Sequence, residues 1–75
     1  MHVELRGCTE ENGNVDSSVP NEDAEFFGVY FGNPGNMHWI ADFANLNDAF
    51  NWAEEVAMAQ ECELRDFTYD KEELQ

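Results

Sequence analysis

The sequence predicts an α+β fold in which one amphipathic helix packs on one face of a four-stranded, mostly antiparallel sheet. Three observations lead to this prediction. Two aromatic-rich runs flank the turn sequence Asn33-Pro34-Gly35-Asn36, an apolar pattern with helical spacing follows them, and a short alternating segment lies near each end. The 75 residues suit a single small acidic domain, residues 1–75, with elements in the order strand, strand, strand, helix, strand.

The first predicted element is a short strand at residues 2–7, where apolar Val3 and Leu5 alternate with Glu4 and Arg6. Residues 8–23 are rich in Asn, Ser, Gly and acidic residues, a composition that is typical of loops. We therefore expect a long flexible loop between the first strand and the second.

The second and third strands form a predicted β-hairpin. Residues 24–32 are aromatic and β-branched, and residues 37–43 resume the same character after the turn. Pro34 fixes φ at the second turn position, and Gly35 permits the positive φ that a type II turn requires next. The sequence therefore predicts two antiparallel strands joined by a tight turn.

The helix is predicted at residues 47–60, with Asn45 or Asn47 as its N-terminal cap. At about 100° per residue, its apolar side chains gather on one side and its acidic side chains on the other. The apolar side holds Ala49, Phe50, Trp52, Ala53, Val56, Ala57 and Ala59. The acidic side holds Asp48, Glu54, Glu55 and Glu61. We expect the helix to pack its apolar side on the sheet and to present a row of acids to water.

The last strand is predicted at residues 62–69, and the tail of residues 70–75 is expected to fray. The first and last strands share a pattern, Val3-Glu4-Leu5-Arg6 and Cys62-Glu63-Leu64-Arg65. Antiparallel pairing with Leu5 opposite Leu64 brings opposite charges together on both flanks, whereas parallel pairing in register brings like charges together. The charges therefore favour antiparallel pairing of these two strands.

Both faces of the predicted hairpin are apolar, and a single helix covers only one face of the sheet. The uncovered face is expected to carry Phe26, Tyr30, His38 and Ile40. An apolar patch with an acidic rim is typical of a protein interface, formed either with a second copy or with a target protein. The alternative is that the loop of residues 8–23 and the C-terminal tail fold over this face.

The formal net charge is −14, from 17 acidic and three basic residues. This charge repels nucleic acid and anionic membranes, so we expect direct binding to neither, and a basic protein or a cation is the natural partner. The first residues lack the features of a secretion signal, and no stretch has the roughly 20 apolar residues of a membrane span. We therefore expect a cytoplasmic protein in which Cys8 and Cys62 are reduced.

The acids do not have the setting that catalysis needs. General acid–base catalysis requires a desolvated carboxyl group, and the acids lie on a solvated helix face, in loops or in the tail, with Asp42 as the exception. Nucleophilic catalysis needs a Cys beside a base, and a transition metal needs closely spaced ligands. The candidates for both lie far apart in the sequence: His2, Cys8, His38 and Cys62. We expect no enzyme activity and no cofactor.

A calcium loop is matched only in part, by the alternation of Asn12, Asn14, Asp16 and Ser18 and by Asp23 at the twelfth place. The first ligand of such a loop is normally Asp, Ser17 stands where the tight turn needs Gly, and no helices flank the segment. We therefore expect no metal site here.

The remaining explanation of the charge is a surface that a basic protein binds in place of phosphates. This is the chemistry of DNA-mimic inhibitors from phages and mobile elements, such as anti-restriction and anti-CRISPR proteins. The similarity is one of size, charge and compactness, and no motif links the chain to a particular family. The expected contact residues are Asp48, Glu54, Glu55 and Glu61, followed by Glu63, Asp66 and Asp70. The alternative is an interaction module, possibly homodimeric, that binds through the aromatic sheet face.

Overall fold

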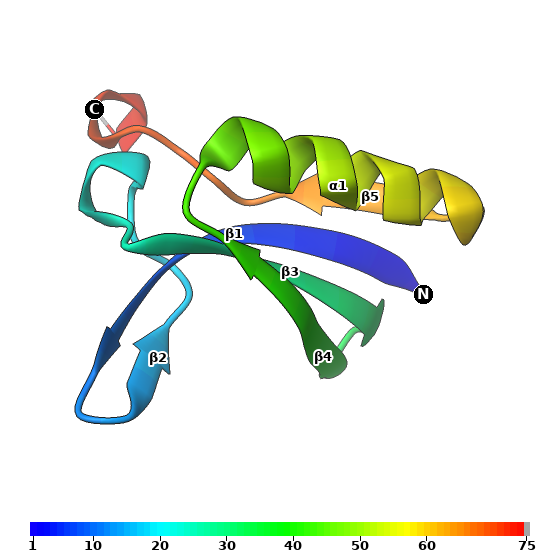
Figure 1. The fold of residues 1–75 in the computed structure, drawn as a ribbon, viewed down its shortest axis with the longest axis horizontal. Coiled ribbons are helices and arrows are strands. Elements are labelled where there is room, and N and C mark those ends of the chain that lie inside the picture. The colour runs from blue at the N-terminus through cyan, green and yellow to red at the C-terminus, as the bar shows by residue number, and fades with distance from the viewer. Residues whose placement is uncertain (75) are drawn as a thin grey trace.

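A computed structural model describes residues 1–74 and has the predicted α+β architecture (Figure 1). A single helix packs against a mostly antiparallel sheet of five strands, one strand more than predicted. The strands are β1 (His2–Glu11), β2 (Asn14–Asp16), β3 (Phe26–Asn33), β4 (Asn36–Phe43) and β5 (Glu63–Asp66). Helix α1 spans Leu46–Ala59, and two short 3-10 segments are η1 (Asn21–Asp23) and η2 (Lys71–Leu74).

Strand β1 is the centre of the sheet, because it pairs with three other strands. Along one edge it pairs with β3 in antiparallel fashion, and β4 follows as the outer strand of the predicted hairpin. Along the other edge it pairs with β5 over its first half and with β2 over its last residues. The turn between β3 and β4 has the positive φ predicted at Gly35, 82°.

The prediction that the first and last strands pair in antiparallel fashion is wrong, because β5 lies parallel to β1. Helix α1 ends beside the start of β1, so the chain enters β5 there and runs in the same direction (Figure 1). The register is shifted by two residues from the in-register alignment of the two patterns, so Val3 lies beside Leu64 and Glu4 beside Arg65. Glu4 and Arg65, which carry opposite charges, are therefore neighbours even though the two strands are parallel. The sequence comparison considered parallel pairing only in register, where like charges are neighbours.

The segment at residues 8–23 contains regular structure where a loop was expected. Strand β1 continues to Glu11 and returns as β2 through Asn12 and Gly13, whose φ values are 53° and 82°. Positive φ at both central positions is the requirement of a type I′ hairpin turn, for which Asn-Gly is the preferred pair. This hairpin extends away from the helix (Figure 1).

The hydrophobic core lies between α1 and the sheet. Val3, Leu5 and Val29 are completely buried, and the helix meets them with Ala49, Ala53 and Ala57. These alanines recur every fourth residue and form one stripe, so the helix backbone approaches the sheet closely. Larger side chains that include Phe50, Trp52 and Val56 pack around this stripe.

The C-terminal segment contacts residues 18–23. The backbone N–H of Asn21 donates to the carbonyl of Tyr69 at 2.8 Å, and the Tyr69 hydroxyl donates to the carbonyl of Ser18 at 2.9 Å. Lys71 Nζ lies 3.1 Å from the carboxylate of Asp23. The last strand is shorter than the predicted 62–69, and residue 75 of the predicted frayed tail lies outside the described residues.

Candidate functional site

The acids of α1 lie on the side of the helix that faces away from the sheet. Asn45 caps the helix, because its Oδ1 accepts hydrogen bonds from the N–H groups of Asn47 at 2.8 Å and Asp48 at 3.3 Å. With this start, the alanine stripe faces the core and the side chains of Asp48, Glu54 and Glu55 are exposed. Asp48 and Glu55 are separated by about 10 Å along the helix axis.

Glu61 lies just beyond the helix end and is exposed. Helix α1 closes with two hydrogen bonds, from Glu61 N–H to the Met58 carbonyl at 3.1 Å and from Cys62 N–H to the Ala57 carbonyl at 2.9 Å. This pair of bonds defines a Schellman motif, in which Glu61 takes a left-handed backbone conformation with φ of 53°. The motif holds the Glu61 backbone in a fixed position at the C-terminal end of the helix.

The other three predicted acids are exposed, but their carboxylates already have partners in this chain. Glu63 Oε1 lies 3.3 Å from Arg65 Nε. Asp66 Oδ1 accepts from the N–H of Thr68 at 2.9 Å, and Asp70 Oδ1 accepts from the side-chain amide of Asn21 at 3.0 Å. Glu63 also lies opposite His2 on the sheet face away from the helix. The seven predicted acids therefore do not form one continuous row.

All three basic side chains of the protein are paired with acids of the same chain. Arg6 Nε lies 2.9 Å from Glu4 Oε1, Arg65 pairs with Glu63, and Lys71 pairs with Asp23. Within residues 1–74, the acids of α1 have no ion-pair partner. The negative charge of the helix is therefore left facing solvent.

The sheet face away from the helix is partly covered by the chain itself. His2 and Glu4 point to this face from β1, yet they are only 3% and 9% exposed. The Glu4 carboxylate lies between His2 Nε2 at 2.7 Å and Arg6 Nε at 2.9 Å, and the Arg6 guanidinium lies 4.3 Å from the centroid of the Phe67 ring. Arg6 Nη1 also reaches the carbonyl of Ser17 at 3.5 Å. The predicted covering of this face by the loop and the C-terminal segment is thus seen on part of it, and the rest is exposed.

Burial opposes ionisation of Glu4, but its hydrogen bonds to His2 and Arg6 outweigh burial and hold the pKa of this carboxyl below its ordinary value of 4.5. Burial and the neighbouring Cys8 thiol, 3.7 Å from the Tyr30 hydroxyl, raise the pKa of Tyr30 to about 12. Both groups are therefore held in one protonation state near neutral pH. Their surroundings indicate a structural role in the sheet.

The exposed part of this face lies over β3 and β4 and is aromatic. The Trp39 ring stacks on Phe26 with centroids 5.7 Å apart and on Tyr30 with centroids 6.5 Å apart. Sequence reasoning did not assign Trp39 to this face and assigned His38 instead. A β-bulge between the two strands leaves Ile40 without a direct partner, so that Trp39 pairs with Tyr30.

The same bulge places His38 opposite Phe31, and thus on the helix side of the sheet. Of the four residues predicted for the aromatic face, Phe26 and Tyr30 are brought together there. His38 is not, and Ile40 lies at the bulge itself and is exposed.

The two cysteines are both free and lie apart in the fold. Cys62 precedes β5 and lies near the start of β1, whereas Cys8 lies beyond the part of β1 that pairs with β5. Cys8 is buried beside Tyr30.

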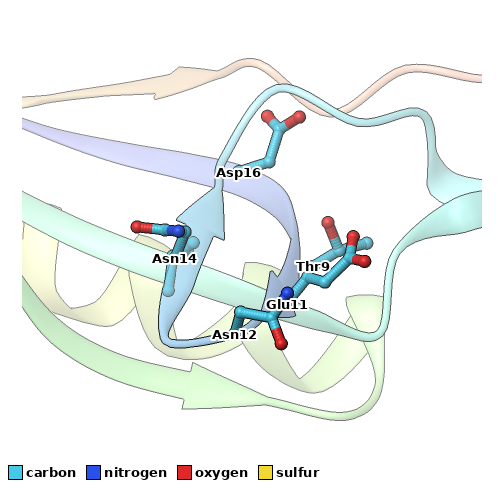
Figure 2. Close-up of a pocket in the computed structure, with 6 residues that line it drawn as sticks. Thr9, Glu11, Asn12, Asn14 and Asp16 are labelled. Atoms are coloured by element: carbon cyan, nitrogen blue, oxygen red, sulfur yellow. The ribbon is translucent and has the colours of Figure 1, made fainter.

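A hollow of about 400 Å³ lies at the β1–β2 hairpin, and its lining includes Asn12, Asn14 and Asp16 of the segment considered for a calcium loop. Figure 2 shows that the Asp16 carboxylate and the Asn12 side chain point away from each other. Asp16 Oδ1 instead accepts from the Ser18 N–H and hydroxyl, at 3.0 and 2.9 Å. In the part of the chain that the structure describes, no three His, Cys, Asp or Glu residues are placed to hold a metal ion.

None of the helices in residues 1–74 has the length and apolarity that crossing a membrane requires. Comparisons of the chain with protein families, with curated proteins and with solved structures found no match.

Proposed function

We propose that this protein is a non-catalytic binding protein that blocks the nucleic-acid site of a basic target, with its carboxylates taking the place of phosphates. One observation carries the proposal. Every acidic side chain whose exposure is described, except that of Glu4, is exposed, while the three basic side chains are each paired within the chain.

The density of charge supports this proposal. The described chain measures 31 Å along its longest axis and carries a net charge of −14. A DNA duplex of that length carries about 18 phosphates, at one per roughly 1.7 Å. The two charges are of the same order, so a protein that is attracted to duplex DNA at long range is also attracted to this surface.

The helix acids are the best-placed contact residues. Asp48, Glu54 and Glu55 are exposed on a capped helix, and Glu61 follows at its fixed end. We place Glu63, Asp66 and Asp70 second, because their carboxylates have partners that compete with a target. Inhibitors of restriction and CRISPR enzymes, encoded by phages and mobile elements and acting in the bacterial cytoplasm, are the class that we propose.

Capture followed by DNA competition tests this function. The protein is immobilised, incubated with a bacterial lysate at low salt, and then washed with a 30-base-pair DNA duplex. We expect captured DNA- or RNA-binding proteins to leave with the duplex and also with salt, because the same basic surface binds both ligands.

A pair of charge-matched variants makes this test specific. Glu54→Gln with Glu55→Gln removes two charges from α1, whereas Glu10→Gln with Glu11→Gln removes two exposed charges from the β1–β2 hairpin. We expect the helix variant to bind the captured proteins at least about tenfold more weakly than the hairpin variant does. Captured proteins that resist both DNA and salt, or equal losses in the two variants, would contradict the proposal.

The competing function is an interaction module that binds through the aromatic sheet face, including as a homodimer. The exposure of Trp39 and Ile40 favours it. Sedimentation equilibrium at low and high salt tests the homodimer, because an apolar dimer persists and strengthens as salt screens the repulsion between two chains of charge −14. A monomer under both conditions excludes the homodimer.

A further inference from the structure

We propose that the hollow beside Trp39 binds an arginine side chain of the partner protein. This site rests on the proposed function, since it names the short-range chemistry by which a basic target is recognised. The long-range attraction comes from the carboxylates, and the hollow adds selectivity for one kind of cation.

The Trp39 ring is exposed and yet fixed in position. Its indole N–H donates to the carbonyl of Ala41 at 3.0 Å, and its ring stacks on Phe26 and Tyr30 with interplanar angles of 18° and 29°. The residue nevertheless remains 47% exposed. A rigid aromatic surface loses little conformational entropy when it binds, which is the property of effective contact residues.

The β-bulge places a carboxylate on the same face of the sheet as this ring. Residues three positions apart on a regular strand point to opposite faces, but the bulge at Ile40 shifts the alternation by one. Trp39 then pairs with Tyr30, and Asp42 pairs with Gly28, two residues earlier on the same face of β3. The bulge therefore brings an indole and a carboxylate to one face of the sheet.

Trp39, Ile40, Ala41 and Asp42 together line an open hollow of about 180 Å³. Asp42 is exposed, and no basic residue among residues 1–74 pairs with it. The hollow is smaller than the roughly 300–1,000 Å³ of small-molecule sites, so it suits one side chain.

Arginine matches both walls of this hollow. A guanidinium is planar and stacks on an aromatic ring, and its N–H groups at the same time donate to a carboxylate. Lysine is a compact, strongly hydrated cation and satisfies the pair less well. A second copy of this chain is a poor occupant, because its own Arg6, Arg65 and Lys71 are already paired and its charge is −14.

Two peptides of equal charge, deca-arginine and deca-lysine, serve as probes in a calorimetric titration at physiological salt. We expect deca-arginine to bind the wild-type protein about tenfold more tightly, because lysine lacks the planar guanidinium that stacks on a ring and donates two parallel hydrogen bonds to a carboxylate. Trp39→Leu and Asp42→Asn should each reduce this preference several-fold. Glu54→Gln with Glu55→Gln should weaken both peptides equally and leave the preference intact.

A spectroscopic measurement guards against a variant that fails to fold. In the Trp52→Phe protein, Trp39 is the remaining tryptophan, so the indole N–H resonance reports on the hollow alone. We expect this resonance to shift and saturate with deca-arginine and to move much less with deca-lysine.

The outcomes separate this site from the proposed function. Equal binding of the two peptides with an unmoved Trp39 resonance overturns the arginine site and leaves the charge-based function standing. If neither peptide binds even at low salt, both proposals are wrong.

Discussion

Glu61 stands at a position where stability favours another residue. Its φ of 53° costs an L-residue with a β-carbon about 1–2 kcal/mol, and helices usually place Gly there. An acid beside the C-terminal end of a helix is also disfavoured by the helix dipole. Two independent terms therefore oppose Glu61, and such local conflicts are expected where a side chain serves function.

Replacing Glu61 with Gly is expected to raise the free energy of unfolding by roughly 1 kcal/mol. The relief of left-handed strain, about 1–2 kcal/mol, exceeds the greater entropy of Gly in the unfolded chain, about 0.4–1 kcal/mol. Urea denaturation measures the change. Glu61→Gln is the matched control, since it removes the charge and keeps the strain, and it should recover only a few tenths of a kcal/mol. A lower free energy of unfolding in the Glu61→Gly variant than in the wild type would contradict the backbone strain assigned to Glu61.

Glu4 is the one acidic residue with described exposure that the fold buries, and it is expected to make stability depend on pH. Its pKa is lower in the folded protein than in the unfolded chain, so the ionised carboxylate stabilises the fold above pH 4.5, and this contribution is lost as the pH falls through the folded value. Glu4→Gln should therefore lower the free energy of unfolding by roughly 1–3 kcal/mol at pH 7.

The difference between wild type and Glu4→Gln should shrink as the pH falls through the lowered pKa of Glu4, because the carboxylate of the wild type is neutralised there. Urea denaturation of both proteins at each pH gives this difference directly. Acid also protonates the other carboxylates and relieves charge repulsion in both proteins. This effect cancels when the two free energies of unfolding are subtracted. A gap that is unchanged at low pH would contradict the assigned role of Glu4.

The side chain of Asn45 caps the N-terminus of helix α1. A comparison with the nearby Asn47 tests this assignment. Asn45 accepts two N–H hydrogen bonds, whereas the side chain of Asn47 makes none among the described residues. We expect Asn45→Ala to lower the free energy of unfolding by about 1 kcal/mol and Asn47→Ala to change it by less than about 0.5 kcal/mol. Equal losses in thermal or urea unfolding would show that the cap is misassigned.

The elements with local signals are those that the sequence predicts well. The turn at Pro34-Gly35 and the alternating aromatic residues are sufficient for the β3–β4 hairpin, and the alanine stripe with Asn45 is sufficient for α1 within one residue at each end. Asn12-Gly13 is an equally local hairpin signal, but the residues around it are acidic and not alternately apolar, so the composition of this segment predicts a loop.

Contacts between distant segments are predicted poorly. The parallel pairing of β1 with β5 depends on where α1 ends, which no pattern in either strand records. The bulge at Ile40 carries no Gly or Pro to mark it, yet it moves Trp39 to the other face. The exposure of the helix acids was thus predictable, whereas the juxtaposition of Trp39 with Asp42 was not.

At the scale of the whole molecule, the surface charge opposes folding. The net charge of −14 lies within a body of 31 × 27 × 22 Å, and salt reduces the repulsion between its acids. We expect the melting temperature at pH 7 to rise by several degrees between 10 mM and 500 mM NaCl. Circular dichroism measures it.

The same experiment near pH 4 is the control. The sequence pI is about 4.1, so the net charge there is close to zero and little repulsion remains for salt to screen. The salt effect should largely disappear. An equal rise at both pH values would point to a general salting-out effect on apolar burial.

The central position of β1 has a consequence for the order of events during protein synthesis. β1 leaves the ribosome before any of its partners, and β5, which completes one of its edges, is made after the helix. Until then β1 has an unpaired edge, the kind of surface through which nascent chains aggregate. The acids that surround it keep neighbouring chains apart during this interval, so the charge that weakens the finished fold also protects the unfinished one.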